Sequence, residues 1–112
     1  METKQAVQAL SALAQETRLA VYRLLVEAGP EGMAAGQIAA ELDLPPATLS
    51  FHLAQLANAG LVRWRQEGRF IYYAPDFAAM NGLVGFLTEN CCARGRCAPV
   101  ATIEIQRTGA RK

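Results

Sequence analysis

The chain has 112 residues, of which 52% are hydrophobic, and its formal net charge is +1. This length allows one domain with a modest core, and the hydrophobic fraction argues against a disordered chain. No apolar run approaches the roughly 20 residues of a membrane span, and the first residues lack the pattern of a signal peptide. We therefore expect a cytoplasmic protein with no membrane partner.

The charges are unevenly distributed along the chain. Residues 1–43 carry three cations and six anions, whereas residues 44–112 carry eight cations and four anions. A local excess of positive charge is typical of a surface that binds nucleic acid. The three cysteines of a chain expected in the cytoplasm indicate free thiols or a metal site rather than a disulfide framework.

Four helices are predicted in the first half of the chain. Residues 3–14 carry Val7, Leu10 and Leu13 or Ala14 on one apolar stripe. Residues 16–28 are apolar on most sides, which favours a central helix packed against several neighbours. Residues 34–42 and 46–58 predict the two helices of a helix-turn-helix, with a proline pair at the start of the second and Gly60 after its end.

The outward face of the helix predicted over 46–58 favours DNA contact. If Leu49, Leu53 and Leu56 point inward, the other side carries small, hydroxyl, amide and aromatic groups, which can contact base edges and thymine methyls. An ordinary packing helix is the alternative, in which an exposed phenylalanine would be unusual. His52, the only histidine, has no visible zinc partners and is expected at the core edge or near a phosphate. The candidate DNA contacts of this helix are Pro46, Ala47, Thr48, Ser50, Phe51, His52 and Gln55.

After Gly60 the apolar period changes from 3.6 to 2. Residues 61–65 and 69–73 predict two strands joined by a turn at 66–68, which is a hairpin. Its position directly after a helix-turn-helix favours a wing. Arg63 and Arg65 share one strand face and Arg69 follows the turn, so these arginines are candidate contacts to phosphates or a minor groove. An edge hairpin whose charges discourage aggregation is the alternative.

A last helix is predicted over residues 76–90, with a broad apolar stripe. A domain of this size has a limited core to receive both this stripe and that of the first helix. We therefore predict a homodimer, the alternative being a monomer with both helices folded onto the central one. The predicted interface consists of Val7, Leu10, Phe77, Met80, Leu83, Val84 and Leu87. The domain is expected to span residues 1–97, followed by a flexible tail over 98–112.

This order of elements is combined with a set of residues typical of one family. The set consists of Glu16-Thr17-Arg18-Leu19, Leu24-Leu25, Ile38-Ala39, Leu42, Ala47–Leu53 with Leu56, Gly60-Leu61-Val62, Glu67-Gly68-Arg69 and Tyr72-Tyr73. Over roughly residues 8–90 the chain resembles the ArsR/SmtB family of bacterial metal-responsive repressors. The resemblance implies a mainly α winged helix-turn-helix with a β-hairpin wing. It also implies a homodimer that binds an inverted-repeat operator in double-stranded DNA and leaves it when an inducer binds.

The cysteines and histidines of the chain restrict the choice of inducer. Several sensors of this family use a Cys-Val-Cys pair on the first helix of the helix-turn-helix, where this chain has no cysteine. Others use His and Asp or Glu pairs on the last helix, where this chain has no histidine. What remains is Cys91, Cys92 and Cys97, which resembles the arsenic-responsive members whose thiols follow the last helix. Three soft thiolates suit pyramidal As(III) or Sb(III), whereas structural zinc prefers four ligands.

The surroundings of the three cysteines leave alternatives open. Arg94 and Arg96 make the neighbourhood positive, which favours thiolates, although a helix C-terminus acts in the opposite direction. Gly95 lets the chain turn back. The cysteines could instead be surface thiols, small buried hydrophobes, or a redox switch in which Cys91 or Cys92 pairs with Cys97. A thiol arsenate-reducing enzyme is disfavoured, because no Gly-rich anion loop or helix N-terminus accompanies these thiols. As(III), Sb(III) and methylarsenite are all candidate inducers.

Overall fold

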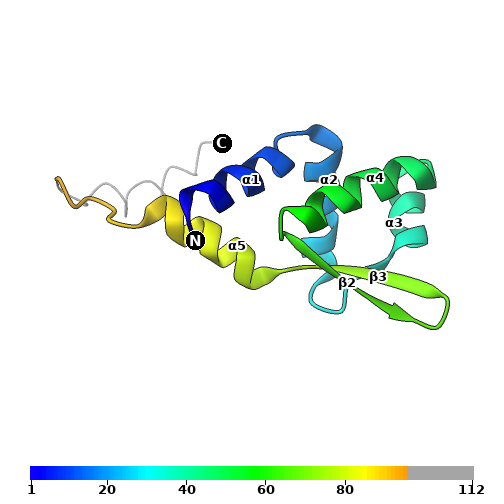
Figure 1. Ribbon diagram of the computed structural model, residues 1–112. Helices are drawn as coiled ribbons and strands as arrows, with labels where there is room; N and C mark the ends of the chain where they lie inside the picture. The colour runs from blue at the N-terminus through cyan, green and yellow to red at the C-terminus, as the bar shows by residue number, and fades with distance from the viewer. Residues whose placement is uncertain (96–112) are drawn as a thin grey trace, which may run out of the picture.

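The computed structural model describes residues 1–95 as a winged helix-turn-helix (Figure 1). The elements of this part are α1 (Thr3–Leu13), α2 (Glu16–Ala28), β1 (Met33–Ala34), α3 (Ala35–Leu42), α4 (Pro46–Asn58), β2 (Val62–Glu67), β3 (Phe70–Pro75) and α5 (Phe77–Thr88). The predicted mainly α fold with a hairpin wing is confirmed, and each helix agrees with its predicted range to within two residues. The predicted domain end at residue 97 and the tail over 98–112 lie outside the described residues.

The turn between α3 and α4 fixes how the two helices of the helix-turn-helix meet. Asp43 ends α3 in the left-handed conformation, with φ of 54°, which a short polar side chain tolerates better than most. The backbone N–H of Leu44 then donates to the carbonyl of Ala39 over 2.9 Å. Pro45 and Pro46 begin α4 where amides lack helical partners in any case. The sequence therefore ends one helix and starts the next within three residues.

The core lies between α2, α3, α4 and the start of the sheet. Its most deeply buried large side chains are Val21, Leu25, Ile38, Leu49, Leu53, Leu56 and Leu61. Helix α2 packs against α1, α3, α4 and β3, as its apolar sides predicted. Burying one such aliphatic side chain contributes roughly 1.5–3 kcal/mol. This cluster makes α4 a rigid part of the body, with one side of the helix facing outward.

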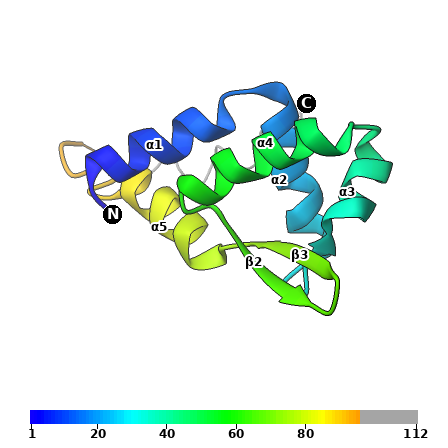
Figure 2. The ribbon, with the colours of Figure 1, turned by 45° about the vertical axis from the view of Figure 1, so that its right-hand side comes forward.

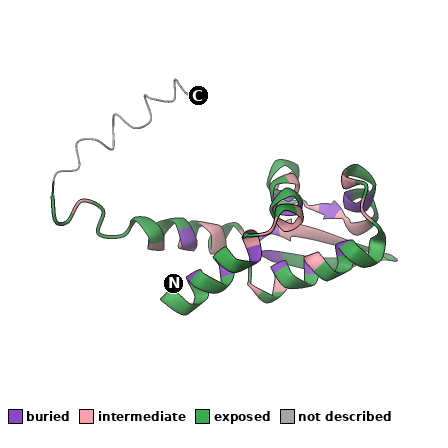
Figure 3. Ribbon diagram, turned by 90° about the horizontal axis from the view of Figure 1, so that it is seen from above, coloured by how far each residue is buried: buried purple, intermediate pink, exposed green. Residues whose placement is uncertain are grey.

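Helices α1 and α5 lie side by side at the end of the molecule away from α3 (Figures 1 and 2). Helix α1 buries a stripe of small residues, Ala6, Ala9 and Ala12, and leaves Val7 and Leu10 exposed. The buried stripe was not predicted from the sequence. Small side chains let α1 approach the body closely, while its larger apolar side chains point outward. Figure 3 shows exposed residues along the outer sides of both helices.

Helix α5 departs from its prediction at one position. Leu83 is only 3% exposed within the single chain, and Met80 is half-buried beside the core. The prediction that a second chain covers Leu83 is therefore wrong, because α5 turns this side chain toward its own body. Phe77, Val84 and Leu87 remain exposed.

The wing belongs to a three-stranded antiparallel sheet of order β1-β3-β2. Strand β1 was not predicted, since two residues are too short to show an alternation. It pairs Met33 with Tyr73 and anchors the base of the wing to the loop after α2. A Cβ at Gly32 would overlap the carbonyl oxygen of Tyr73, so only glycine allows β1 to approach. In the described part of the chain, no helix is long and apolar enough to cross a membrane.

Candidate nucleic-acid interface and thiol site

The side of α4 opposite the core is an exposed surface. Leu49, Leu53 and Leu56 are buried, as predicted. The exposed candidates of this helix are Pro46, Ala47, Thr48, Ser50, Phe51 and Gln55. At 3.6 residues per turn, the centre of the exposed side is Ala47, Phe51, Ala54 and Asn58. Phe51 is 59% exposed, so no other described element covers it.

Two hollows flank α4. One, of about 580 Å³, is formed with α1 and is lined by residues that include Lys4, Gln8, Arg18 and Gln55. The other, of about 350 Å³, is formed with the wing and is lined by residues that include Ser50, Ala54, Trp64, Ile71 and Tyr73. The polar candidates Gln55 and Ser50 therefore lie on opposite flanks of the helix, with Phe51 between them.

His52 connects α4 to the helices beneath it. It is half-buried, in agreement with the prediction of a core-edge histidine. Its Nδ1 lies 3.4 Å from Nη1 of Arg18, and Nε of Arg18 donates to the carbonyl of Ala12 over 2.7 Å. The ring of His52 also meets that of Phe51 edge-on, with centroids 5.5 Å apart. One guanidinium thus contacts the end of α1 and the side of α4.

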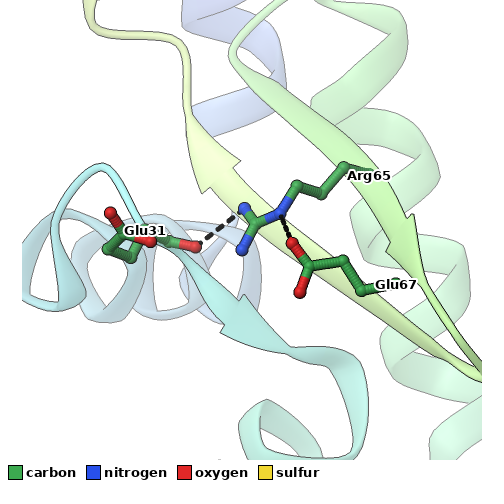
Figure 4. Close-up of polar contacts among 3 residues, drawn as sticks. All are labelled: Glu31, Arg65 and Glu67. Atoms are coloured by element: carbon green, nitrogen blue, oxygen red, sulfur yellow. Dashed lines mark hydrogen bonds and ion pairs between the residues drawn. The ribbon is translucent and has the colours of Figure 1, made fainter.

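Arg65 is engaged with the body of the protein rather than extended from the wing (Figure 4). Its Nε donates to a carboxylate oxygen of Glu67 over 2.7 Å, and its Nη1 donates to the carbonyl of Glu31 over 2.9 Å. Its guanidinium also lies 4.9 Å from the ring centroid of Tyr72. Hydrogen bonding to Glu67 raises the pKa of Arg65. The predicted DNA contact therefore already has partners that tie the wing to the loop after α2.

The pairing register decides which way the wing arginines face. Trp64 is opposite Tyr73, and both line the hollow beside α4. Arg63 and Arg65, one residue on either side of Trp64, therefore lie on the other face of the hairpin. The sequence predicted their common face, but the structure turns that face away from α4. Arg69, exposed beside the turn, is the wing arginine that we retain as a candidate phosphate contact.

Exposed apolar side chains on the wing were not among the predicted site residues. Trp64 is 60% exposed, and Phe70 and Ile71 are also exposed. Trp64 and Ile71 share the hollow beside α4. The alternation of the strands could have shown that Trp64 and Tyr73 share a face, but not that this face lies toward α4.

The first two cysteines lie in a series of turns that follows α5. The N–H of Cys91 donates to the carbonyl of Thr88 over 3.0 Å, and that of Gly95 to the carbonyl of Cys92 over 3.0 Å. Cys92 has a left-handed backbone, with φ of 63°. These turns bring Sγ of Cys91 to 3.4 Å from Sγ of Cys92. Cys91 is exposed and Cys92 is half-buried.

Cys97 and Arg96 lie outside the described residues, so the three-thiol site stays a prediction. Within residues 1–95, no group of three His, Cys, Asp or Glu side chains is placed to hold a metal ion. The vicinal pair is therefore the part of the predicted thiol site that the described structure places.

A family model for a helix-turn-helix domain matches residues 13–64. The transcriptional activator HlyU of Vibrio cholerae is 30% identical over 87 residues, covering 78% of each chain. A structure of reduced HlyU superposes with a TM-score of 0.61 at 28% identity, covering 80% of this chain and 92% of HlyU. The putative arsenical resistance operon repressor of Halobacterium salinarum is 40% identical over 79 residues, covering 65% of this chain and 60% of that protein. A solved ArsR family transcriptional regulator has a TM-score of 0.67 at 25% identity, covering 80% of this chain and 89% of that one.

The chain belongs to the ArsR/SmtB family of winged-helix regulators. It is therefore a transcriptional regulator whose helix-turn-helix fold implies DNA binding. In the ArsR/SmtB fold seen here, α3 and α4 form the helix-turn-helix, and β2 and β3 form the wing. The relatives named above are transcriptional regulators rather than enzymes.

Proposed function

We propose that the protein is an operator-binding repressor that leaves DNA when As(III) or Sb(III) binds through Cys91, Cys92 and Cys97. It would act in the cytoplasm, where thiols stay reduced. The observation that carries the metalloid assignment is the vicinal pair, whose sulfurs lie 3.4 Å apart directly after α5. The similarity to a putative arsenical resistance operon repressor adds support.

The choice of ion rests on the chemistry of the ligands. Three soft thiolates suit a pyramidal ion with a lone pair, which favours As(III) or Sb(III), whereas structural zinc prefers four ligands. Cys97 would supply the third sulfur.

On the DNA side, α4 would enter the major groove and the wing would contact the backbone beside it. Two-fold symmetric regulators place such helices in successive major grooves, roughly 34–36 Å apart. A homodimer would supply the second helix. The proposed interface is the exposed apolar surface formed by Val7, Leu10, Phe77, Val84 and Leu87. The half-buried Met80 lies on the same helix, between Phe77 and Val84.

Helix α5 would couple the two events. It carries the exposed side chains of the proposed interface and leads directly into the turns that hold Cys91 and Cys92. An ion that pulls these turns together would bias the orientation of α5, and with it the spacing of the two α4 helices. The coupling required is modest, since about 1–3 kcal/mol changes affinity by 5–150-fold.

The test is release of a fluorescent operator duplex during titration with As(III), Sb(III), Zn(II) and methylarsenite. We expect As(III) or Sb(III) to release the duplex at the lowest concentration and Zn(II) to have no effect. The matched control is the Cys91→Ser variant, which should bind the duplex as wild type does and retain it in arsenite. Release by Zn(II) alone would contradict the metalloid assignment.

A thiol-based redox sensor on the same fold is the second candidate. In this function Cys91 or Cys92 would pair with Cys97 on oxidation, and the similarity to HlyU, which has been solved in a reduced form, favours it. Oxidation would join two cysteine sulfurs and pass two electrons and two protons to a peroxide. Mass spectrometry after mild peroxide, combined with counting of free thiols, separates this function from metalloid binding. Since HlyU is named an activator, a reporter assay with and without the protein is needed to establish the sign of control.

A further inference from the structure

The centre of the exposed side of α4 is apolar except for Asn58, the last residue of the helix. The buried positions 49, 53 and 56 place Ala47, Phe51 and Ala54 on the opposite side of the helix. The 13 residues of α4 include no Lys, Arg, Asp or Glu. A helix that reads DNA mainly through charged side chains would present them here. Instead, Phe51 is the largest side chain at this centre and is 59% exposed.

Phe51 contacts its sequence neighbour His52, which in turn contacts Arg18. Its ring meets the ring of the half-buried His52 at 5.5 Å with an interplanar angle of 67°. Arg18 contacts His52 at 3.4 Å and the carbonyl of Ala12 at 2.7 Å. Because fixing a mobile side chain on binding costs entropy, a ring supported in this way is suited to a specific contact.

The major groove offers one apolar group to such a ring. Base edges there present hydrogen-bond donors and acceptors, and the C5-methyl of thymine is the exception. Phe51 has no hydrogen-bonding group, so the other base edges would lose water without gaining a partner. The neighbouring Ala47 and Ala54 are small enough to let the helix approach the bases closely.

We propose that Phe51 is a specificity-determining residue that packs against thymine C5-methyl groups in each operator half-site. The inference rests on the proposed role of α4 as the DNA-reading helix, and it names the chemical group that this helix reads. Ser50 and Gln55, on the two flanks of the helix, would add hydrogen bonds to the neighbouring bases. Discrimination at the central position then comes from a methyl group rather than from a hydrogen bond.

The experiment removes the methyl group from the DNA and the ring from the protein. The probe is a fluorescein-labelled duplex that the wild-type protein selects from a randomised library. Each thymine is replaced in turn by deoxyuridine, which lacks only the methyl. We expect the wild-type protein to lose affinity about fourfold for each contacted methyl, as for burial of one CH₂-sized group. The Phe51→Ala variant should bind thymine and deoxyuridine duplexes equally at that position, and Phe51→Leu should retain part of the discrimination.

Two controls separate the possible failures. Trp64→Ala removes an aromatic ring of similar exposure from the wing and should leave the deoxyuridine sensitivity unchanged. Ser50→Ala reports whether α4 reads DNA at all. If deoxyuridine has no effect on the wild-type protein while Ser50→Ala still alters sequence preference, the role of Phe51 is refuted and the role of α4 stands. If both substitutions in α4 leave affinity and preference unchanged, both proposals are refuted.

Discussion

The two ends of the molecule differ in what they bury. At the helix-turn-helix end, large aliphatic side chains of α2, α3 and α4 interdigitate and are almost fully covered within one chain. At the other end, α1 buries alanines while Val7 and Leu10 remain exposed, and α5 leaves Val84 and Leu87 exposed. The first end has a core of large side chains and exposes Phe51 and Trp64 on the side proposed to face DNA, whereas the second end exposes the larger apolar side chains of both its helices, a surface of the kind that another chain covers. This contrast supports a rigid reading head joined to an assembly surface.

The largest effect is expected from a charge in the assembly surface. Val84 is exposed in the single chain, so Val84→Glu should not disturb the fold of one chain. Covering that carboxylate with a second chain costs several kcal/mol, so the variant should sediment as a monomer and lose operator binding. A variant that remains a dimer would place the interface elsewhere, and a wild-type chain that is monomeric at micromolar concentration would refute the homodimer. Leu83→Glu is unsuitable, because Leu83 belongs to the core of its own chain.

A matched pair of leucines tests the contrast in packing. Leu53 is 2% exposed and Leu87 is 58% exposed. Leu53→Ala should lower the free energy of unfolding by about 2–5 kcal/mol, because it leaves a cavity between α4 and the core. In the monomeric Val84→Glu background, Leu87→Ala should change the free energy of unfolding by no more than about 0.5 kcal/mol. Urea denaturation measures the free energy of unfolding of both variants. Equal losses would show that Leu53 and Leu87 do not differ in how they pack within one chain.

Tyr22 provides a smaller test inside the core. Its hydroxyl is buried and has no hydrogen-bond partner among the described residues. Burial raises the pKa of Tyr22, and Asp76 raises it further. An unpartnered buried hydroxyl is unfavourable, so Tyr22→Phe should raise the free energy of unfolding by about 1 kcal/mol. A clear loss of stability would show that the hydroxyl has a partner in the assembled protein.

The smallest expected effect concerns the wing. Arg69→Ala should weaken binding to all DNA sequences alike and lower the slope of log affinity against log salt by about 0.9, the value for one phosphate contact. Arg63→Ala is the matched control, because Arg63 lies on the face of the hairpin turned away from α4. If the control lowers the slope and Arg69→Ala does not, the orientation inferred for the wing is incorrect.

The sequence predicted the parts of the fold that have a strong local period. The leucines of α4 repeat at helical spacing, and the change of period after Gly60 locates the hairpin, so both were found. The exposure of Phe51 also followed from the inward position of those leucines. Strand β1 was missed because two residues carry no period, and only pairing with β3 defines it.

Other features depend on tertiary packing that a local pattern does not encode. The apolar residues of α1 form two possible stripes, and close approach to the body selects the alanines for burial. Apolar residues occupy several sides of α5, so the choice of Leu83 as its buried residue depends on where the helix docks. The direction of Arg65 depends on the carbonyl of Glu31, which is 34 residues away in the sequence.

The central claim is that metalloid binding at the thiols controls release from DNA. The most direct measurement is arsenite-dependent release of a fluorescent operator by the wild-type protein and by the variant with Cys91, Cys92 and Cys97 all changed to serine. We expect the two proteins to bind the operator equally without arsenite. Arsenite should lower the wild-type affinity about 5–150-fold and leave that of the variant unchanged. Equal release from both proteins would contradict the account, because the inducer would then act at another site.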